Sequence, residues 1–153
     1  SSAASDVYKR QSRDNARTPM QWDASENAGF TTGKPWIAVN PNYKKINVAD
    51  QLKREDSVFH YYQKLIRLRK ENEIIVYGNY ELLLPEDENI FAYVRTLDNQ
   101  KLLVVCNFSK SEQKFDFSGY ENAKVLISNY NGDTVKDGIL KPYEATVLLL
   151  ENA

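Results

Sequence analysis

Two arginines four positions apart have the clearest capacity for chemistry in this chain. Arg13 and Arg17 enclose Asp14, Asn15 and Ala16 in a segment rich in turn-forming residues. A guanidinium group presents a rigid fork of N–H donors, which can bind a carboxylate or the neighbouring hydroxyls of a sugar. The same charges can instead hold the loop in place through salt bridges, and composition alone favours this structural role.

The remaining reactive side chains form no recognisable catalytic arrangement. The single histidine, His60, lies in a helical pattern and is expected to be a packing or surface residue. The single cysteine, Cys106, lies in an apolar strand pattern and is expected to be a small core residue. The composition gives no support for a zinc site. No spacing of carboxylates identifies an acid and a base, and no glycine-rich phosphate loop is present. We therefore predict no catalytic residue, no metal and no organic cofactor in this chain.

The charge balance excludes several classes of partner. The 153 residues include 20 Lys+Arg and 21 Asp+Glu, a formal net charge of -1. Such a chain has no overall field that favours nucleic acid or an anionic membrane surface. No apolar run approaches the roughly 18 residues of a membrane span, and no secretory signal pattern opens the chain. We expect a cytoplasmic globular protein with no nucleic-acid or membrane partner.

A long loop must position the two arginines. Residues 12–50 are punctuated by Asn, Pro and Gly and show little periodicity, although they also contain large apolar side chains. These side chains are Met20, Trp22, Phe30 and Trp36. A loop longer than about 15 residues is unusual in a compact domain unless it is functional. Because large apolar residues need a surface to bury against, we infer that this loop covers a scaffold.

The rest of the chain changes from a helical to an alternating pattern. Residues 57–72 have the apolar spacing of one helix, with Ser57 as its N-cap. From Glu73 onward the period is two, and turn residues separate six short strand candidates. The candidates are residues 80–84, 90–95, 102–108, 114–117, 125–128 and 146–150. Short strands at this spacing predict an antiparallel β-sandwich.

The long loop also carries a specific signature. The twelve consecutive residues SRDNARTPMQWD at 12–23 are followed by the blocks AGFTTG at 28–33 and VNPNY at 39–43. Together they closely resemble the C-terminal third of glycoside hydrolase family 13 α-glucosidases. The nearest branch includes oligo-1,6-glucosidases, dextran glucosidases, trehalose-6-phosphate hydrolases and sucrose isomerases. The resemblance covers about residue 12 to the end of the chain.

The resemblance implies a fold and a division into domains. Members of this family have a (β/α)8 barrel followed by an antiparallel β-sandwich. Residues 12–73 would then be the end of the catalytic barrel, comprising a loop and the last helix, and residues 74–153 the C-terminal β-sandwich. Residues 1–11 do not follow the pattern and are expected to be foreign or disordered. The expected fold class is therefore mainly β, with a sandwich preceded by one helix and a long loop.

The same resemblance implies a function for the intact protein. It indicates the C-terminal fragment of a retaining α-glucosidase that hydrolyses α-glucosidic bonds at the nonreducing ends of short oligosaccharides. The catalytic acids of the family lie on earlier barrel strands, and none of their motifs occurs here, so the fragment itself is expected to be inactive. A complete barrel needs about 250 residues, so the N-terminal barrel is expected to be missing. The expected partners are this barrel and, in the intact enzyme, an oligosaccharide substrate.

Two residues are candidates for substrate binding. In the family, an arginine at the position of Arg13 reaches the nonreducing-end glucose, and Arg17 lies on the same loop, where bracing is its favoured role. Within the family, a trehalose-6-phosphate hydrolase or sucrose isomerase fragment stays open as an alternative. Outside it, a free-standing carbohydrate-binding or structural β-sandwich also stays open.

Overall fold

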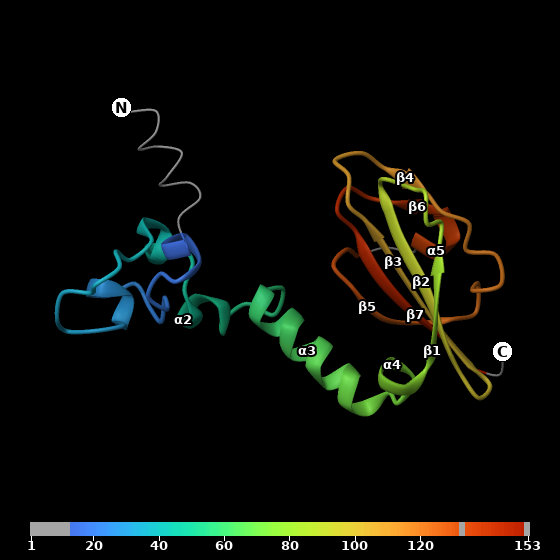
Figure 1. Cartoon of the computed structure of the whole chain (residues 1–153), viewed down its shortest axis with the longest axis horizontal. Coiled ribbons are helices and arrows are strands. Elements are labelled where there is room, and N and C mark those ends of the chain that lie inside the picture. The colour runs from blue at the N-terminus through green and yellow to red at the C-terminus, as the bar shows by residue number, and fades with distance from the viewer. Residues whose placement is uncertain (1–12, 132–133, 152–153) are drawn as a thin grey trace. The chain divides into compact units, whose positions relative to one another are not determined.

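The computed structural model describes residues 13–131 and 134–151, apart from the side chains of Arg13 and Asn15 (Figure 1). The predicted foreign segment, residues 1–11, lies outside the described residues. The chain forms two compact units, Ser1–Tyr62 and Gln63–Ala153, which are described separately below. In the described part of the chain, no helix is long and apolar enough to cross a membrane.

The first unit is built from short helical turns connected by loops. Its elements are η1 (Arg13–Ala16), η2 (Glu26–Gly29), η3 (Pro41–Lys44), α2 (Val48–Gln51) and the start of α3 (Val58–Glu71). Two asparagines cap two of these turns. Asn40 Oδ1 accepts a hydrogen bond from Asn42 N at the start of η3, and Asn47 Oδ1 accepts one from Asp50 N at the start of α2. Such side-chain caps satisfy N–H groups that short helices leave unpaired.

Helix α3 confirms the prediction of a helix over residues 57–72. It begins at Val58, directly after Ser57, whose side-chain oxygen accepts a hydrogen bond from the backbone N–H of His60 at 3.4 Å. Ser57 is therefore the N-cap that the sequence predicts. Arg69 and Lys70 occupy the last turn, where positive charge complements the helix dipole.

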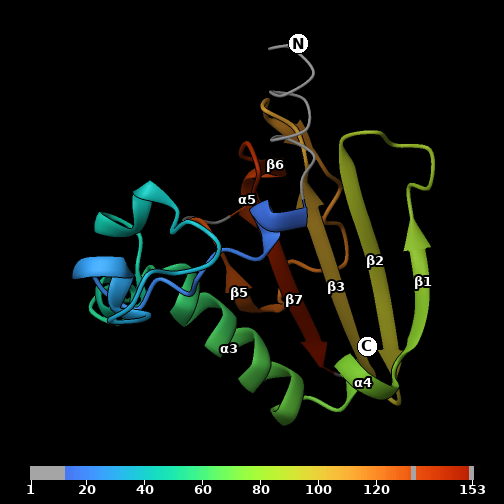
Figure 2. The same cartoon turned by 60° about the vertical axis from the view of Figure 1, so that its left-hand side comes forward.

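The second unit contains an antiparallel sheet of five strands in the order β1-β2-β3-β7-β5, and a smaller sheet of β4 and β6 (Figure 2). The large sheet consists of β1 (Asn79–Leu83), β2 (Ile90–Leu97), β3 (Gln100–Asn107), β5 (Lys124–Ser128) and β7 (Ala145–Glu151). The small sheet consists of β4 (Gln113–Lys114) and β6 (Ile139–Leu140). Two short helices, α4 (Ile74–Tyr77) and α5 (Thr134–Asp137), complete the unit.

The main core lies on one face of the large sheet, toward the layer that contains β6. Alternate residues of β2, β3 and β7 point to this face, as the strand period of two requires. The buried members are Ile90, Ala92, Leu103, Val105, Phe117, Leu140 and Leu148. This packing of two unequal antiparallel layers confirms the predicted mainly β sandwich.

The opposite face of the large sheet has a second, smaller core. Its buried members are Ile74, Leu102, Val104, Leu126 and Leu149. Ile74 of α4 is 1% exposed, and Leu68 of α3 packs against the same cluster. Figure 2 shows α4 at one end of the sheet, so this core lies toward that end.

Two buried polar residues connect the loops at the other end of the sandwich. Asn107 Nδ2 donates hydrogen bonds to the carbonyl oxygens of Ser111 at 2.8 Å and Lys141 at 2.9 Å. The fully buried carboxylate of Glu144 accepts hydrogen bonds from Lys141 N at 2.8 Å and from the hydroxyl of Thr134. Because buried polar groups are costly unless they are paired, these contacts specify the loop conformation.

The structure differs from the sequence predictions at two elements. The strand predicted at residues 114–117 ends at Lys114, because Phe115 and Phe117 turn into the main core instead of continuing a ladder. Residues 74–77 were expected to begin the alternating region, yet they form α4. Burial of Ile74 in the second core overrides the strand preference of this β-branched run.

Candidate substrate-binding loop

The loop that carries Arg13 and Arg17 begins with the helical turn η1. Arg17 Nη2 forms an ion pair with Asp14 Oδ1, and Arg17 N donates a hydrogen bond to Asp14 O at 3.0 Å. Both side chains of the pair are more than half exposed, so solvent screens their attraction. The backbone of Arg13 starts η1, whereas its side chain lies outside the described atoms.

Gln21 closes the base of the long loop formed by residues 22–47. Val48 N donates a hydrogen bond to Gln21 O at 2.9 Å, which joins the two ends of the loop. The Gln21 side-chain amide donates to Asn42 Oδ1 at 3.0 Å and also to the carbonyl oxygen of Ile46. These contacts give the loop a fixed base, and within it only the short turns η2 and η3 are regular.

A left-handed turn shapes the first part of this loop. Asn27, Ala28 and Gly29 have φ values of 52°, 59° and 66°. Asp23 N donates a hydrogen bond to the carbonyl oxygen of Ala28 at 3.2 Å, which closes the turn. The carboxylate of Asp23 in turn accepts from the hydroxyl and the backbone N–H of Ser25. The hydroxyl first, and then the backbone N–H, hold the pKa of Asp23 below its usual 3.8.

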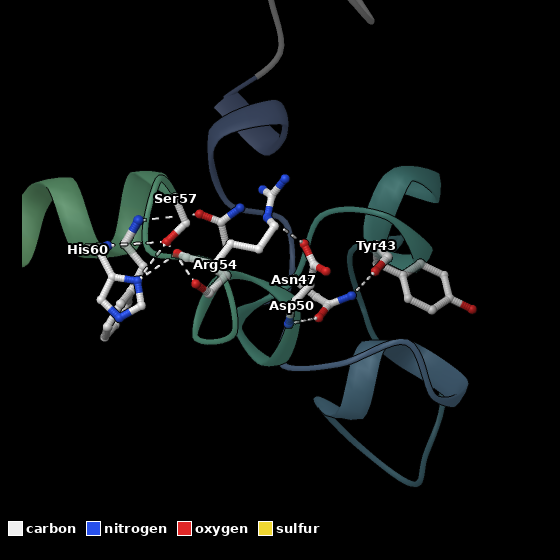
Figure 3. A network of polar contacts seen from close by, with 8 residues as sticks. Tyr43, Asn47, Asp50, Arg54, Ser57 and His60 are labelled. Atoms are coloured by element: carbon white, nitrogen blue, oxygen red, sulfur yellow. Dashed lines mark hydrogen bonds and ion pairs between the residues drawn. The ribbon is translucent and has the colours of Figure 1, made fainter. Parts of the chain in front are cut away.

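Ser57 and His60 form the centre of a polar network at the start of α3 (Figure 3). His60 Nδ1 lies 2.8 Å from the carbonyl oxygen of Arg54. Because a carbonyl only accepts, the ring proton must lie on Nδ1. Ser57 Oγ donates to the carbonyl oxygen of Gln51 at 2.7 Å and lies 3.1 Å from the same ring nitrogen. His60 thus helps to fix the start of α3.

The network extends to the end of the long loop (Figure 3). Asn47 is 6% exposed, and its Nδ2 donates a hydrogen bond to the carbonyl oxygen of Tyr43 at 2.8 Å. Asp50, whose backbone N–H binds Asn47, forms an ion pair with Arg54 at 3.4 Å. The loop, α2 and the beginning of α3 are therefore connected within one polar framework.

Large apolar side chains cover the outside of this ordered framework. Trp36 is 96% exposed, and Trp22 and Met20 are about half exposed. A hollow of about 410 Å³ lies between residues 18–21, residues 46–48, Gln51 and Val58. These exposed apolar side chains make the loop a candidate interaction surface.

No sequence signal identified Gln21, Asn47 and His60 as the residues that organise the site. The Asn-Ala-Gly run at 27–29 was the best available signal of a left-handed turn, because Asn and Gly tolerate positive φ. Gln21 and Asn47 make contacts to residues distant along the chain, which no local pattern predicts. In the described part of the chain, no group of three or more His, Cys, Asp or Glu side chains is arranged to hold a metal ion.

The described residues thus combine a loop closed at its base, the helix α3 and a C-terminal antiparallel sandwich. The profile of the α-amylase catalytic domain matches residues 1–78, and that of the C-terminal domain of the α-amylase SusG matches residues 90–147. The first match covers half of the chain. The chain therefore belongs to the α-amylase family, glycoside hydrolase family 13.

Individual relatives support this assignment. The chain is 53% identical over 144 residues to an oligo-1,6-glucosidase of Bacillus cereus, covering 91% of this chain and 26% of that protein. It resembles the crystal structure of Bacillus licheniformis trehalose-6-phosphate hydrolase with a TM-score of 0.87 and 45% identity, over 95% of this chain and 28% of that one. An isomaltulose synthase from Klebsiella sp. LX3 gives a TM-score of 0.81 and 41% identity, over 90% and 26%. The chain thus spans about a quarter of the length of these relatives.

Proposed function

We propose that this chain is the C-terminal part of a retaining α-glucosidase of the oligo-1,6-glucosidase type. The parent enzyme would hydrolyse α-glucosidic bonds at the nonreducing ends of short oligosaccharides in carbohydrate catabolism. Residues 12–73 would complete the catalytic barrel, and residues 74–153 would form the C-terminal domain. The single cysteine excludes an intrachain disulfide, which fits a cytoplasmic parent.

The proposal depends above all on one observation, namely that an ordered loop exposes large apolar side chains. The backbone of residues 22–47 is closed at its base and capped within, yet Trp22 and Trp36 are exposed. Burial of apolar area stabilises by about 25 cal/mol per Å², so such side chains gain by contact with another surface. The missing part of the barrel would supply that surface.

The chemistry of the parent enzyme would be divided between this chain and the part of the parent that precedes it. In a retaining mechanism, a carboxylate forms a glucosyl-enzyme, and a second carboxylic acid protonates the leaving oxygen and then activates water. Both groups would lie in the part of the parent that precedes this chain. Arg13 would contribute donors to the hydroxyls of the bound glucose, and Arg17, paired with Asp14, would support the loop and its substrate contacts.

A chimeric enzyme tests this proposal. Residues 12–153 would replace the matching C-terminal quarter of the B. cereus oligo-1,6-glucosidase, and glucose release from isomaltose would be measured. We expect turnover, and we expect Arg13→Ala to lower kcat/KM by about 10- to 100-fold, because hydrogen bonds from a charged donor are lost. Lys110→Ala, which removes an exposed positive charge in the second unit, is the control and should retain activity. A chimera that is folded but inactive would contradict the proposal.

Alternatives within the family are separated by substrate. A trehalose-6-phosphate hydrolase or a sucrose isomerase would also give a folded chimera, because the determinants of the substrate would lie in the part of the parent that precedes this chain. Competition assays on the intact parent enzyme with isomaltose, trehalose 6-phosphate and sucrose distinguish the three. Preference for isomaltose is the expected result.

A free-standing carbohydrate-binding sandwich is the second candidate function. The observation in its favour is a cluster of partly exposed aromatic rings formed by Tyr80, Phe91 and Tyr93. Aromatic faces of this kind can stack on sugars. Isothermal titration of the chain with isomaltose and maltose decides this, and absence of heat would eliminate the candidate.

A further inference from the structure

A hollow lies in the smaller layer of the second unit, between the segment that follows β4 and helix α5. Its volume is about 510 Å³, within the range of about 300–1,000 Å³ that small-molecule sites occupy. Residues 115–118 and Glu121 line one side of it, and residues 135–138 line the other. Helix α5 contacts β6 in this layer (Figure 1). The hollow is therefore contained within the second unit, on the side of the large sheet that carries the main core.

The base of the hollow is aromatic and is ordered by packing. The ring centroids of Phe115 and Phe117 lie 4.8 Å apart, with the rings edge to face. Phe117 is 4% exposed and belongs to the main core, whereas Phe115 and Val135 pack against that core and stay partly exposed. Part of an aromatic surface is thus left uncovered at the bottom of a concave site, where it can contact the apolar face of a ring-shaped ligand.

Hydrogen bonds hold the two sides of the hollow in place. Phe115 N donates a hydrogen bond to the carbonyl oxygen of Gly138 at 3.1 Å, which joins one side to the other. The Asp116 carboxylate accepts hydrogen bonds from the backbone N–H of Ser118, at 3.0 Å, and from the Ser118 hydroxyl. Because the site is formed before any ligand arrives, binding costs little conformational entropy.

The rim of the hollow consists mainly of hydrogen-bond acceptors. Asp116, Glu121 and Asp137 are exposed residues of the lining. The hydroxyl of Ser118, and then its backbone N–H, hold the pKa of Asp116 below its usual 3.8, so this carboxylate is an ionised acceptor at neutral pH. The lining also contains Lys136, so its three carboxylates leave the rim with a net negative charge.

This combination defines the class of ligand that the hollow suits. The aromatic base requires a ligand with an apolar ring face, and the acceptor-rich rim requires many hydroxyl donors. Sugars have both properties. A negative rim repels an anionic ligand such as a sugar phosphate, so the sugar must be uncharged.

We propose that this hollow binds an uncharged oligosaccharide, with a sugar ring on Phe115 and sugar hydroxyls donating to the carboxylates of the rim. The site uses none of the residues of the candidate substrate-binding loop. The inference rests on the proposed function only in the choice of glucose-based sugars as ligands. Such a site would keep the parent enzyme associated with oligosaccharides through its C-terminal domain and so raise their effective concentration.

Amide NMR titration of the chain tests this proposal. With maltotriose or isomaltotriose, we expect saturable shifts of the amides of residues 115–121 and 135–138, and no such shifts in residues 79–83. Trehalose 6-phosphate should bind at the same amides at least about 10-fold more weakly, because the negative rim repels its phosphate.

A pair of double variants makes the test specific. Glu121→Gln with Asp137→Asn removes two charged acceptors and preserves the shape of the hollow, so the affinity for maltotriose should fall by about 10-fold or more. Glu88→Gln with Glu112→Gln is the matched control, because it makes the same change of net charge at exposed positions outside the lining. The control should keep the original affinity, and both double variants should keep the melting temperature within about 2 °C.

Each alternative outcome would overturn the proposal. Absence of saturable shifts in the lining with both sugars would do so, as would equal affinities of the two double variants. Shifts caused by spermidine but not by the sugars would make the hollow a site for cations. Sugar-induced shifts confined to residues 79–83 and 91–93 would place binding on the rings of the second candidate function instead. Turnover of isomaltose by the chimera tests the proposed function independently of all these results.

Discussion

Gly29 lies directly over the carboxylate of Asp23 in the long loop. A Cβ atom placed on Gly29 would be 2.8 Å from Asp23 Oδ2 and 2.9 Å from Asp23 Oδ1, and the backbone of Gly29 has a φ of 66°. The same carboxylate receives the hydrogen bonds of Ser25. The close approach to Asp23 leaves no room for a side chain at position 29. The positive φ of this residue also favours glycine.

Gly29→Ala should therefore disrupt the loop. We expect a cost of about 1–3 kcal/mol from the positive φ and the contact with Asp23, and faster hydrogen exchange of the amides of residues 22–30. Gly33→Ala is the matched control, because a Cβ there would meet only Thr31 Oγ1 at 3.8 Å. Equal exchange rates in the two variants would contradict this account of the turn.

Ser57→Ala should fray the start of α3. The Ser57 side chain caps His60 N, donates to Gln51 O and is 2% exposed, so its loss removes a cap and leaves the Gln51 carbonyl with one partner fewer. A lost cap costs about 0.5–2 kcal/mol. Hydrogen exchange of the amides of residues 59–61 should accelerate. Ser118→Ala, at an exposed turn in the second unit, should leave these amides unchanged.

Glu144→Ala should destabilise the sandwich strongly. The fully buried carboxylate accepts hydrogen bonds from Lys141 N and the Thr134 hydroxyl, and truncation would leave both donors unpaired and a cavity behind. We expect a loss of about 2–4 kcal/mol of unfolding free energy in urea denaturation. Glu112→Ala, at an exposed position, should change it by less than about 0.5 kcal/mol. A small effect at Glu144 would refute its role as the connection between the loops.

Asp87 should titrate below its usual pKa. Its Oδ1 accepts hydrogen bonds from the backbone N–H groups of Ile90 and Asn89, each at 2.8 Å, and these bonds hold its pKa below 3.8. A depressed folded-state pKa stabilises the fold above the unfolded-state value, and this contribution is lost as the pH falls through the folded pKa. Carboxyl NMR titration should give a midpoint under 3.8, and Asp87→Asn should remove the corresponding pH dependence. A midpoint at or above 3.8 would count against the capping role.

Local sequence patterns predicted the regular elements well because those elements follow simple periods. The apolar spacing of Val58, Leu65 and Leu68 and the cap at Ser57 define α3, and alternation in β2, β3 and β7 defines the main core. Short elements were harder to predict. Both β6 and α5 contain too few residues to show a period, and Ile74 forms a helical turn because tertiary burial outweighs its local preference.

The candidate site was predictable only in part, because some of its contacts join residues that are far apart in the sequence. Arg13 and Arg17 are identifiable from the sequence because a guanidinium group can bind a carboxylate or the hydroxyls of a sugar. The ion pair of Arg17 with Asp14 is also predictable, because the two residues are close in the sequence. Gln21 instead acts through partners 21 and 25 positions away, Asn42 and Ile46. Such contacts depend on the path of the whole loop, which a single sequence does not specify by any local rule.

The most direct test of the central claim is an activity assay on the purified chain by itself. If the residues that break the glycosidic bond lie in another part of the parent enzyme, release of nitrophenol from nitrophenyl α-glucoside should not exceed the rate in buffer. Turnover above that background, retained after repurification and abolished by a substitution within this chain, would contradict the account.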